Sequence, residues 1–242
     1  QIALAPSPEA ADVILVNTCA FIEPAREEAA EAILSACAYK REGGCRAVIV
    51  AGCMVQRYRE RLQKAFPDVD AFLGVDELAR VGEIVRQVAA GRHPGVVAAR
   101  GEARNLYAPL YPTLLFTGGP FAYLKIAEGC NHRCAYCAIP NIRGRFRSRG
   151  TDELVEEARG MVAAGVKEIS LISQDSLLYG ADRQDGATLT GLLRRLDALE
   201  GEFWLRVLYG YPAGVTDELL ALLNGSRHIC RYLDLPVQHS HP

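Results

Sequence analysis

Residues 121–137 read FAYLKIAEGCNHRCAYC, an apolar stretch that runs directly into three closely spaced cysteines. The apolar residues from Phe121 to Ala127 predict a β-strand. Cys130, Cys134 and Cys137 then follow with the spacing C-x3-C-x2-C. The stretch therefore predicts a strand that leads into a compact loop of three thiols.

Strand and helix patterns alternate after this loop. Further strands are predicted at 169–172, 203–208 and 232–235, and the helices between them begin near Thr151, Leu189 and Thr216. This alternation favours an α/β fold with a parallel sheet, either a (β/α) barrel or part of one. Ligands of such sheets lie at the carboxyl ends of the strands. Three polar clusters fall there, namely the cysteine loop, Ser173-Gln174-Asp175 and Gln238-His239.

The amino-terminal part shows the same alternation on a smaller scale. Apolar runs predict buried strands at 13–16, 47–50 and 69–73, and helices are predicted at 25–39, 57–65 and 78–88. Pro94, Pro109, Pro112 and Gly118-Gly119 interrupt the pattern. We therefore predict an α/β domain over residues 1–91, a linker over 92–119 and a second domain over 120–242.

The composition excludes several classes of protein. Half of the 242 residues are hydrophobic and 23% are charged, which excludes a disordered or collagen-like chain. A net charge of −2 argues against a generally basic surface for nucleic acid. No stretch approaches the roughly 18 apolar residues of a membrane span, and no secretory signal is visible. Without a secretion signal, the eight cysteines indicate metal binding or chemistry in the cytoplasm rather than disulfides.

Three thiolates on one short loop are typical ligands of an iron–sulfur cluster. A four-iron cluster takes four ligands, so this loop would leave one iron open to a small molecule. The alternative is a zinc ion held by the three cysteines and His132. Structural zinc sites usually draw their ligands from two separated pairs, which favours the cluster. A loop that binds nothing is the third interpretation.

The motifs around the loop resemble those of the radical S-adenosylmethionine (SAM) methylthiotransferases. C-x3-C-x-aromatic-C after the first strand of a parallel barrel is similar to radical SAM enzymes, and Asn17-Thr18-Cys19 and Ala51-Gly52-Cys53 resemble the methylthiotransferases among them. Two branches compete. The RimO type modifies an aspartate of the twelfth small-subunit ribosomal protein, and the MiaB type modifies a transfer-RNA adenosine. The RimO type is favoured by Ser173-Gln174-Asp175, Tyr179-Gly180, residues 201–204 and residues 234–239.

The resemblance implies a cofactor set and a role for each matching residue. Cys130, Cys134 and Cys137 would ligate a [4Fe-4S] cluster whose open iron binds SAM, and a radical derived from SAM would act on the β-carbon of the aspartate. Tyr136 would lie against the adenine, or it is a packing aromatic. Gln174, Asp175 and Gln238 would contact SAM, or they form a polar rim of the barrel. An electron donor is required as a partner.

The resemblance also implies a second [4Fe-4S] cluster, which the family uses for sulfur insertion. Cys19 and Cys53 resemble two of its three ligands, and the third is expected upstream of residue 1. Both thiols follow apolar strands, so they can converge at one edge of the sheet. Two unrelated strand-end thiols are the alternative. The remaining barrel strands and a further β domain are expected beyond residue 242.

Four arginines alternate with other residues after the cysteine loop, at Arg143, Arg145, Arg147 and Arg149. In an extended chain they would share one face, which would suit a contact to ribosomal RNA or to an acidic substrate. The alternative is a solvated loop in which one or two of them pair internally. The isolated cysteines are interpreted as small core residues or bystander thiols, namely Cys37, Cys45 and Cys230. A non-catalytic zinc or iron–sulfur module that binds RNA or a protein is the least favoured function.

Overall fold

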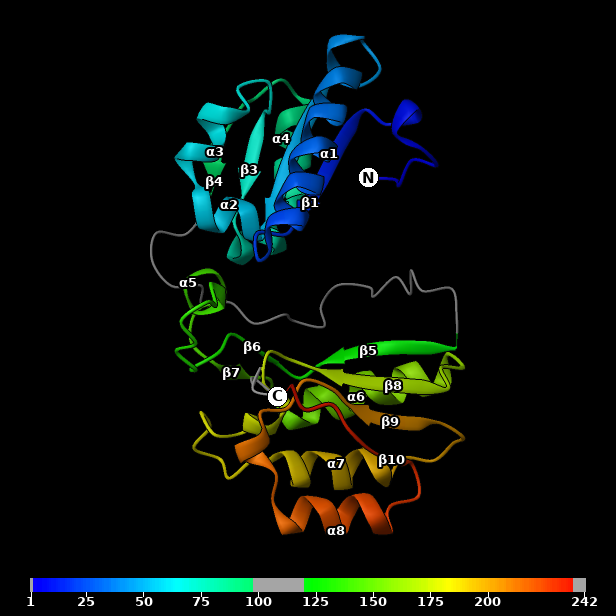
Figure 1. Ribbon diagram of the computed structural model, residues 1–242. Helices are drawn as coiled ribbons and strands as arrows, with labels where there is room; N and C mark the ends of the chain where they lie inside the picture. The colour runs from blue at the N-terminus through cyan, green and yellow to red at the C-terminus, as the bar shows by residue number, and fades with distance from the viewer. Residues whose placement is uncertain (1, 98–119, 237–242) are drawn as a thin grey trace. The chain divides into compact units, whose positions relative to one another are not determined.

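The computed structural model describes residues 2–97 and 120–236, which fall into two compact units (Figure 1). The first unit contains residues 2–97 and 132–144. The second contains residues 120–131 and 145–236. Each unit has its own four-stranded parallel sheet, so the α/β fold class predicted from the sequence is confirmed.

The sheet of the first unit has the strand order β1-β2-β3-β4. All six residues of β2 are buried, as a continuous apolar run predicts. The fourth strand lies inside the range 92–119 that the sequence predicts as a linker, and its three residues are too few to give a periodic signal. The strands are β1 (Val13–Thr18), β2 (Ala47–Gly52), β3 (Ala71–Leu73) and β4 (Gly95–Val97).

Helices cover both faces of this sheet (Figure 1). Ile33 of α1 (Glu23–Arg41) packs in one cluster with Val48, and Ile84 of α4 (Val81–Ala89) packs in another with Ile49. Because neighbouring strand residues point to opposite faces, the two clusters lie on opposite sides of β2. The other elements of the unit are α2 (Cys53–Tyr58), α3 (Glu60–Ala65), α5 (Ile139–Arg143) and the 3-10 helices Pro8–Ala10 and Val75–Arg80.

The single helix predicted at 57–65 is wrong. Two short helices, α2 and α3, meet at Arg59, whose φ of +46° lies in the left-handed region. A non-glycine residue in that region cannot continue a right-handed helix. The break leaves α2 as a six-residue helix whose first residue is Cys53.

The second unit has the strand order β10-β9-β8-β5, with a helix before each of β8, β9 and β10. The predicted strand at 121–127 is divided into β5 and the two-residue β6. The helices are α6 (Thr151–Ala163), α7 (Leu189–Asp197) and α8 (Asp217–Gly225), with 3-10 helices at Ser176–Leu178 and Pro212–Gly214. The strands are β5 (Phe121–Lys125), β6 (Ala127–Glu128), β7 (Arg147–Ser148), β8 (Glu168–Ile172), β9 (Trp204–Val207) and β10 (Ile229–Leu233).

Helices α6, α7 and α8 all lie on one face of this sheet (Figure 1). Their apolar residues form one core with Leu124, Leu171 and Leu205 of the strands. The residues that alternate with these point to the other face, where Tyr123 and Trp204 remain 51% and 62% exposed. A parallel sheet with helices on one side only is the arrangement of an open portion of a (β/α) barrel. Within the described ranges, no helix has the length and apolar character needed to cross a membrane.

Candidate functional site

The cysteine loop starts and ends at an antiparallel pair of very short strands. Glu128 of β6 pairs with Arg147 of β7, and Ala127 pairs with Ser148. The hydroxyl of Ser148 donates to Asp182 over 2.6 Å and accepts from the amide of Gly180. The base of the loop is therefore closed by backbone pairing and tied to the segment after β8.

Inside this base, Asn131 closes a smaller ring. Its Oδ1 accepts a hydrogen bond from the amide of Phe146 over 3.1 Å, and Phe146 itself is buried. Gly129, just before Cys130, has a φ of +79°, a conformation that favours glycine. These two features turn the chain sharply at the point where the first cysteine leaves the strand.

None of the three thiols of the loop forms a disulfide, and all three are partly exposed. The amide of Cys137 donates to the carbonyl of Cys134 over 3.0 Å, which forms a tight turn around Ala135 and Tyr136. Tyr136 is 68% exposed, which leaves its ring accessible to a ligand. Its contact with adenine stays a prediction.

In the ranges that the structure describes, no three His, Cys, Asp or Glu side chains are grouped as ligands of a metal ion. The ligand roles of Cys130, Cys134 and Cys137 therefore stay predictions, as does the alternative that adds His132. The chemistry of the donors fits an iron–sulfur cluster, because accessible thiols on one loop are the ligands that such clusters take.

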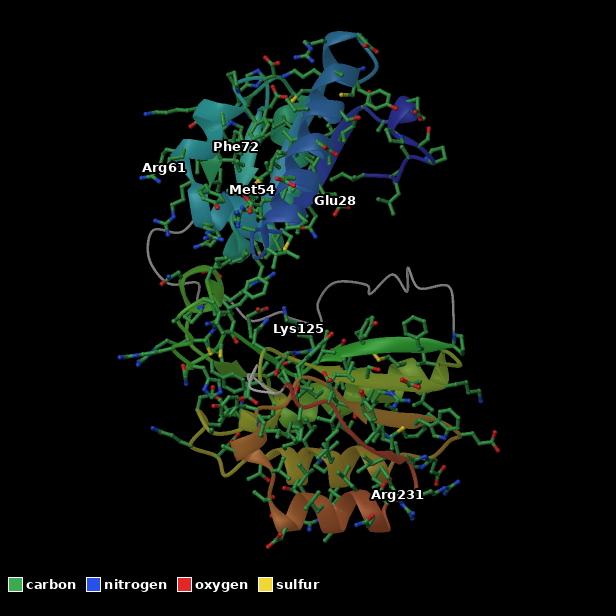
Figure 2. All side chains as sticks on the ribbon, viewed as in Figure 1. Glu28, Met54, Arg61, Phe72, Lys125 and Arg231 are labelled. Atoms are coloured by element: carbon green, nitrogen blue, oxygen red, sulfur yellow. The ribbon has the colours of Figure 1, made fainter. Side chains whose placement is uncertain are left out.

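Gln174 and Asp175 follow β8, the strand that pairs with β5. Lys125, the last residue of β5 and labelled in Figure 2, pairs with Ile172, the last residue of β8. Cys130 therefore follows one strand end and Gln174 follows the adjacent one. This proximity agrees with the expectation that ligands gather at the carboxyl ends of parallel strands.

Gln174 and Asp175 differ in their hydrogen bonds. The Oε1 of Gln174 is buried and has no hydrogen-bond partner among the described residues. Asp175 is 2% exposed, and its Oδ1 accepts from the amide of Tyr211 over 3.1 Å. An unpaired buried acceptor leaves Gln174 ready to bind a ligand, whereas Asp175 already holds the segment after β9. Gln238, the third predicted SAM contact, lies outside the described residues.

Sequence reasoning missed the turn that Asp175 holds. Tyr209 has a φ of +60°, and its side chain is 49% exposed. Its carbonyl accepts from the amide of Ser176 over 2.8 Å, and its amide donates to Asp234. A tyrosine in the left-handed region costs of order 1–3 kcal/mol and is common near functional sites. Nothing in the sequence marks this conformation, because it depends on contacts with two other strands.

Cys19 and Cys53 follow neighbouring strand ends in the first unit. Strands β1 and β2 pair with Thr18 opposite Gly52, and each cysteine is the next residue along its chain. The predicted convergence of the two strand ends at one edge of the sheet is therefore confirmed. Cys19 is exposed and Cys53 is partly exposed, and Met54 beyond it is buried (Figure 2).

A cation lies against one of these thiols. The Nη2 of Arg143, at the end of α5, donates to the Sγ of Cys53 over 3.2 Å. Helix α5 is held against α2 because Ile142, which is 1% exposed, packs into the core of the first unit. A guanidinium is a strong hydrogen-bond donor, so Arg143 is placed to donate to the sulfur of Cys53 when that residue serves as a ligand.

The isolated cysteines match their interpretation as core residues in two of three cases. Cys37 and Cys45 are 3% and 7% exposed and pack in the core of the first unit. Cys230, in β10, is only partly buried. Burial raises the pKa of all three thiols, which disfavours the thiolate that a metal requires.

The four arginines after the loop do not all lie in one extended, exposed stretch. Arg143 ends a helix, and Arg149 has a side chain that is 1% exposed and pairs with Glu153 and Glu157. The Nη1 of Arg149 also donates to the carbonyl of Lys125 over 2.8 Å. Internal pairing, the alternative to an RNA contact, is confirmed for Arg149. A contact of Arg145 with RNA stays a prediction.

Comparisons with known protein families give a match for each of the two parts of the chain. The model of the uncharacterized protein family UPF0004 matches residues 1–74, and that of the radical SAM superfamily matches residues 124–242. Ribosomal protein uS12 methylthiotransferases RimO from Desulforudis audaxviator and Trichlorobacter lovleyi are each 46% identical over 95% of the chain. The chain spans 50% and 51% of these two relatives, about half of their length.

A likeness to solved structures supports the fold alone. The radical SAM methyltransferase TsrM from Kitasatospora setae, solved with cobalamin and a [4Fe-4S] cluster, aligns over 96% of this chain and 49% of its own. The TM-score is 0.65 and the sequence identity is 14%. The motifs, the sheet topology and the identity to the uS12 enzymes agree: residues 124–242 match the radical SAM superfamily, and the chain as a whole is similar in sequence to the radical SAM methylthiotransferases of the RimO type.

Proposed function

We propose that this chain is part of an enzyme that adds a methylthio group to the β-carbon of an aspartate in ribosomal protein uS12. The observation that carries the proposal is the 46% identity to uS12 methylthiotransferases over 95% of the chain. No specific observation favours the transfer-RNA branch. A ribosomal substrate would place the enzyme in the cytoplasm.

Cys130, Cys134 and Cys137 would hold a [4Fe-4S] cluster that leaves one iron for SAM. When bound, the cluster and SAM supply the one-electron chemistry that an unreactive C–H bond requires and that acid–base groups cannot provide. The β6–β7 pair fixes both ends of the ligand loop. The buried Oε1 of Gln174 would accept a hydrogen bond from the amino group of SAM, with Tyr136 against the adenine and Gln238 near the ribose. Asp175 would position the segment at Tyr211 rather than contact SAM.

Cys19 and Cys53 would ligate a second cluster, completed by a cysteine upstream of residue 1. The paired ends of β1 and β2 and the guanidinium beside Cys53 support this assignment. An electron donor would deliver the reducing equivalents to the clusters. A contact between ribosomal RNA and Arg145, the exposed arginine after the loop, is part of the proposal.

The test uses the full-length enzyme, reconstituted with iron and sulfide without oxygen. We expect SAM cleavage and a mass increase of uS12 when ribosomes are supplied, and no product with transfer RNA. Cys134→Ala should abolish SAM cleavage, whereas Cys45→Ala, a matched change at a buried thiol, should retain it. Modified transfer RNA would support the other branch, and a protein that binds only zinc and shows no visible absorption would support a non-catalytic module.

A further inference from the structure

The guanidinium of Arg143 approaches a thiol that is 90 residues away in the sequence. Its Nη2 donates to the Sγ of Cys53 over 3.2 Å, which is within the range for a hydrogen bond to sulfur. Both residues belong to the first unit. The contact joins the segment after the triple-cysteine loop to the motif Ala51-Gly52-Cys53.

The backbone around Arg143 is fixed on both sides. Ile142 is 1% exposed and packs in the core that contains Val50. Gly144 has a φ of +74°, and its amide donates to the carbonyl of Pro140 over 3.1 Å, which ends the helix. The side chain of Arg143 therefore starts from a rigid helix end rather than from a loose loop.

The partner thiol is fixed as well. Cys53 is the first residue of α2, and the amide of Met54 donates to the buried hydroxyl of Thr18 over 3.3 Å. A Cβ at Gly52 would lie 2.7 Å from the Oδ1 of Asn17, so the chain passes close to β1 at this point. The end of α5 and the start of α2 thus hold the guanidinium of Arg143 and the sulfur of Cys53 in contact.

A hydrogen bond to the sulfur of a cluster ligand changes the cluster's redox properties. The donor draws negative charge from the thiolate, which favours the more negative, reduced form and raises the reduction potential. Arginine suits this role because it stays charged at every accessible pH and holds its donors in a rigid plane. We infer that Arg143 is a positioning residue for the second cluster, donating to ligand Cys53 and raising the reduction potential of that cluster. This inference rests on the second cluster proposed above.

The experiment isolates the second cluster in the full-length chain. A background variant with alanine at Cys130, Cys134 and Cys137 removes the radical-generating cluster, so that iron, sulfide and electron paramagnetic resonance report on the other one. Arg143→Met and Arg145→Met are compared in this background. Arg145 is exposed and lies two residues away, which makes it a matched control for the loss of one arginine.

We expect R143M to shift the midpoint potential to a lower value and to change the resonance spectrum, with the iron content unchanged, and R145M to match the background. Equal potentials in all three proteins would overturn the inference while leaving the second cluster in place. If the background binds no iron, the second cluster fails and the inference with it. If R143M loses its iron, the midpoint potential of R143Q, which keeps a polar side chain without the charge, is measured instead. A lower potential than that of the background supports the inference, and an equal potential overturns it.

Discussion

The hydroxyl of Thr18 donates to the carbonyl of Ala51 over 2.7 Å and so joins the end of β1 to the end of β2. The same oxygen accepts from the amide of Met54 in the first turn of α2. Thr18 is 5% exposed, so water does not replace these contacts. One buried hydroxyl therefore orders the two strand ends that carry Cys19 and Cys53.

We expect Thr18→Val to lower the free energy of unfolding by about 1–3 kcal/mol, because it leaves a buried carbonyl and a buried amide without their partner. Denaturant unfolding of the chain measures the loss. Thr18→Ser keeps the hydroxyl and is the control, with a loss less than half as large. Equal losses in the two variants would show that the methyl group, not the hydroxyl, stabilises this edge.

Gly52 is predicted to tolerate no side chain. Its φ is +100°, and a Cβ would lie 2.7 Å from Asn17 and 2.8 Å from the carbonyl of Thr18. Gly43 has a φ of +78° with nothing within 4 Å of its would-be Cβ, so it separates backbone strain from the clash. We expect Gly43→Ala to cost about 1–2 kcal/mol and Gly52→Ala clearly more, measured by thermal or denaturant unfolding. Similar costs would contradict the close approach of the two strand ends.

Removing the buried cation of Arg149 is expected to be severe. Arg149→Met leaves Glu153 and Glu157 without their partner, and breaking such a buried pair costs about 3–5 kcal/mol. Arg159→Met removes an exposed arginine that pairs with exposed Glu156, and its cost should stay within about 0.5 kcal/mol. Denaturation midpoints compare the two variants. A small effect of Arg149→Met would mean that the two carboxylates find water or another cation.

The pair of Glu168 and Arg206 predicts a dependence on pH. Hydrogen bonds from Arg206 hold the pKa of Glu168 below its ordinary value of 4.5. The folded state therefore binds the proton less readily than the unfolded state, and this pair stabilises the fold above pH 4.5. The stabilisation is lost as the pH falls from 4.5 toward the lowered pKa.

Unfolding of the unsubstituted chain and of Glu168→Gln across pH 3–6 checks this direction. The difference in stability between them should be largest near pH 6 and shrink at the acid end. A difference that stays constant for Glu168→Gln would contradict the lowered pKa.

The sequence predicted the sheets better than the connections. Apolar, β-branched runs such as Val48-Ile49-Val50 favour buried strands. Strands β1, β2, β8 and β9 lie where they were expected. The three residues of β4 and the two residues each of β6 and β7 were missed, because elements this short carry no periodic pattern. β6 and β7 pair with each other and β4 pairs with the equally short β3, so these strands depend on the surrounding structure rather than on a local pattern.

Helix caps show how local signals succeed or fail. A helix was predicted to begin near Thr216, and the hydroxyl of Thr216 caps α8 by accepting from the amide of Leu219 over 3.2 Å. A helix was also predicted to begin near Thr151, but Gly150 holds the cap position of α6, and the Thr151 hydroxyl lies 3.1 Å from that of Tyr179. Tyr179 comes from a distant segment, so no local pattern could reveal the competition.

In the candidate site too, some features could be predicted from local sequence and others depend on tertiary packing. Strand ends could be placed from the sequence, which put Cys19 and Cys53 after paired strand ends and Gln174 after the strand that pairs with β5. Arg143 was noticed only as one of four arginines, and its contact with Cys53 depends on the packing of α5 against α2. The burial of Arg149 depends in turn on two glutamates of α6, one and two turns further along the chain.

Because Thr18 pairs with Gly52, the positions of Cys19 and Cys53 relative to each other depend on the lengths of β1 and β2. They do not depend on the lengths of the segments that connect these strands to the rest of the unit. An insertion between α1 and β2 would leave both cysteines where they are. A single inserted residue within either strand would carry one thiol about 3.3 Å past the other and turn it to the opposite side. Natural length variation should therefore accumulate in the connecting segments and avoid the last residues of these strands.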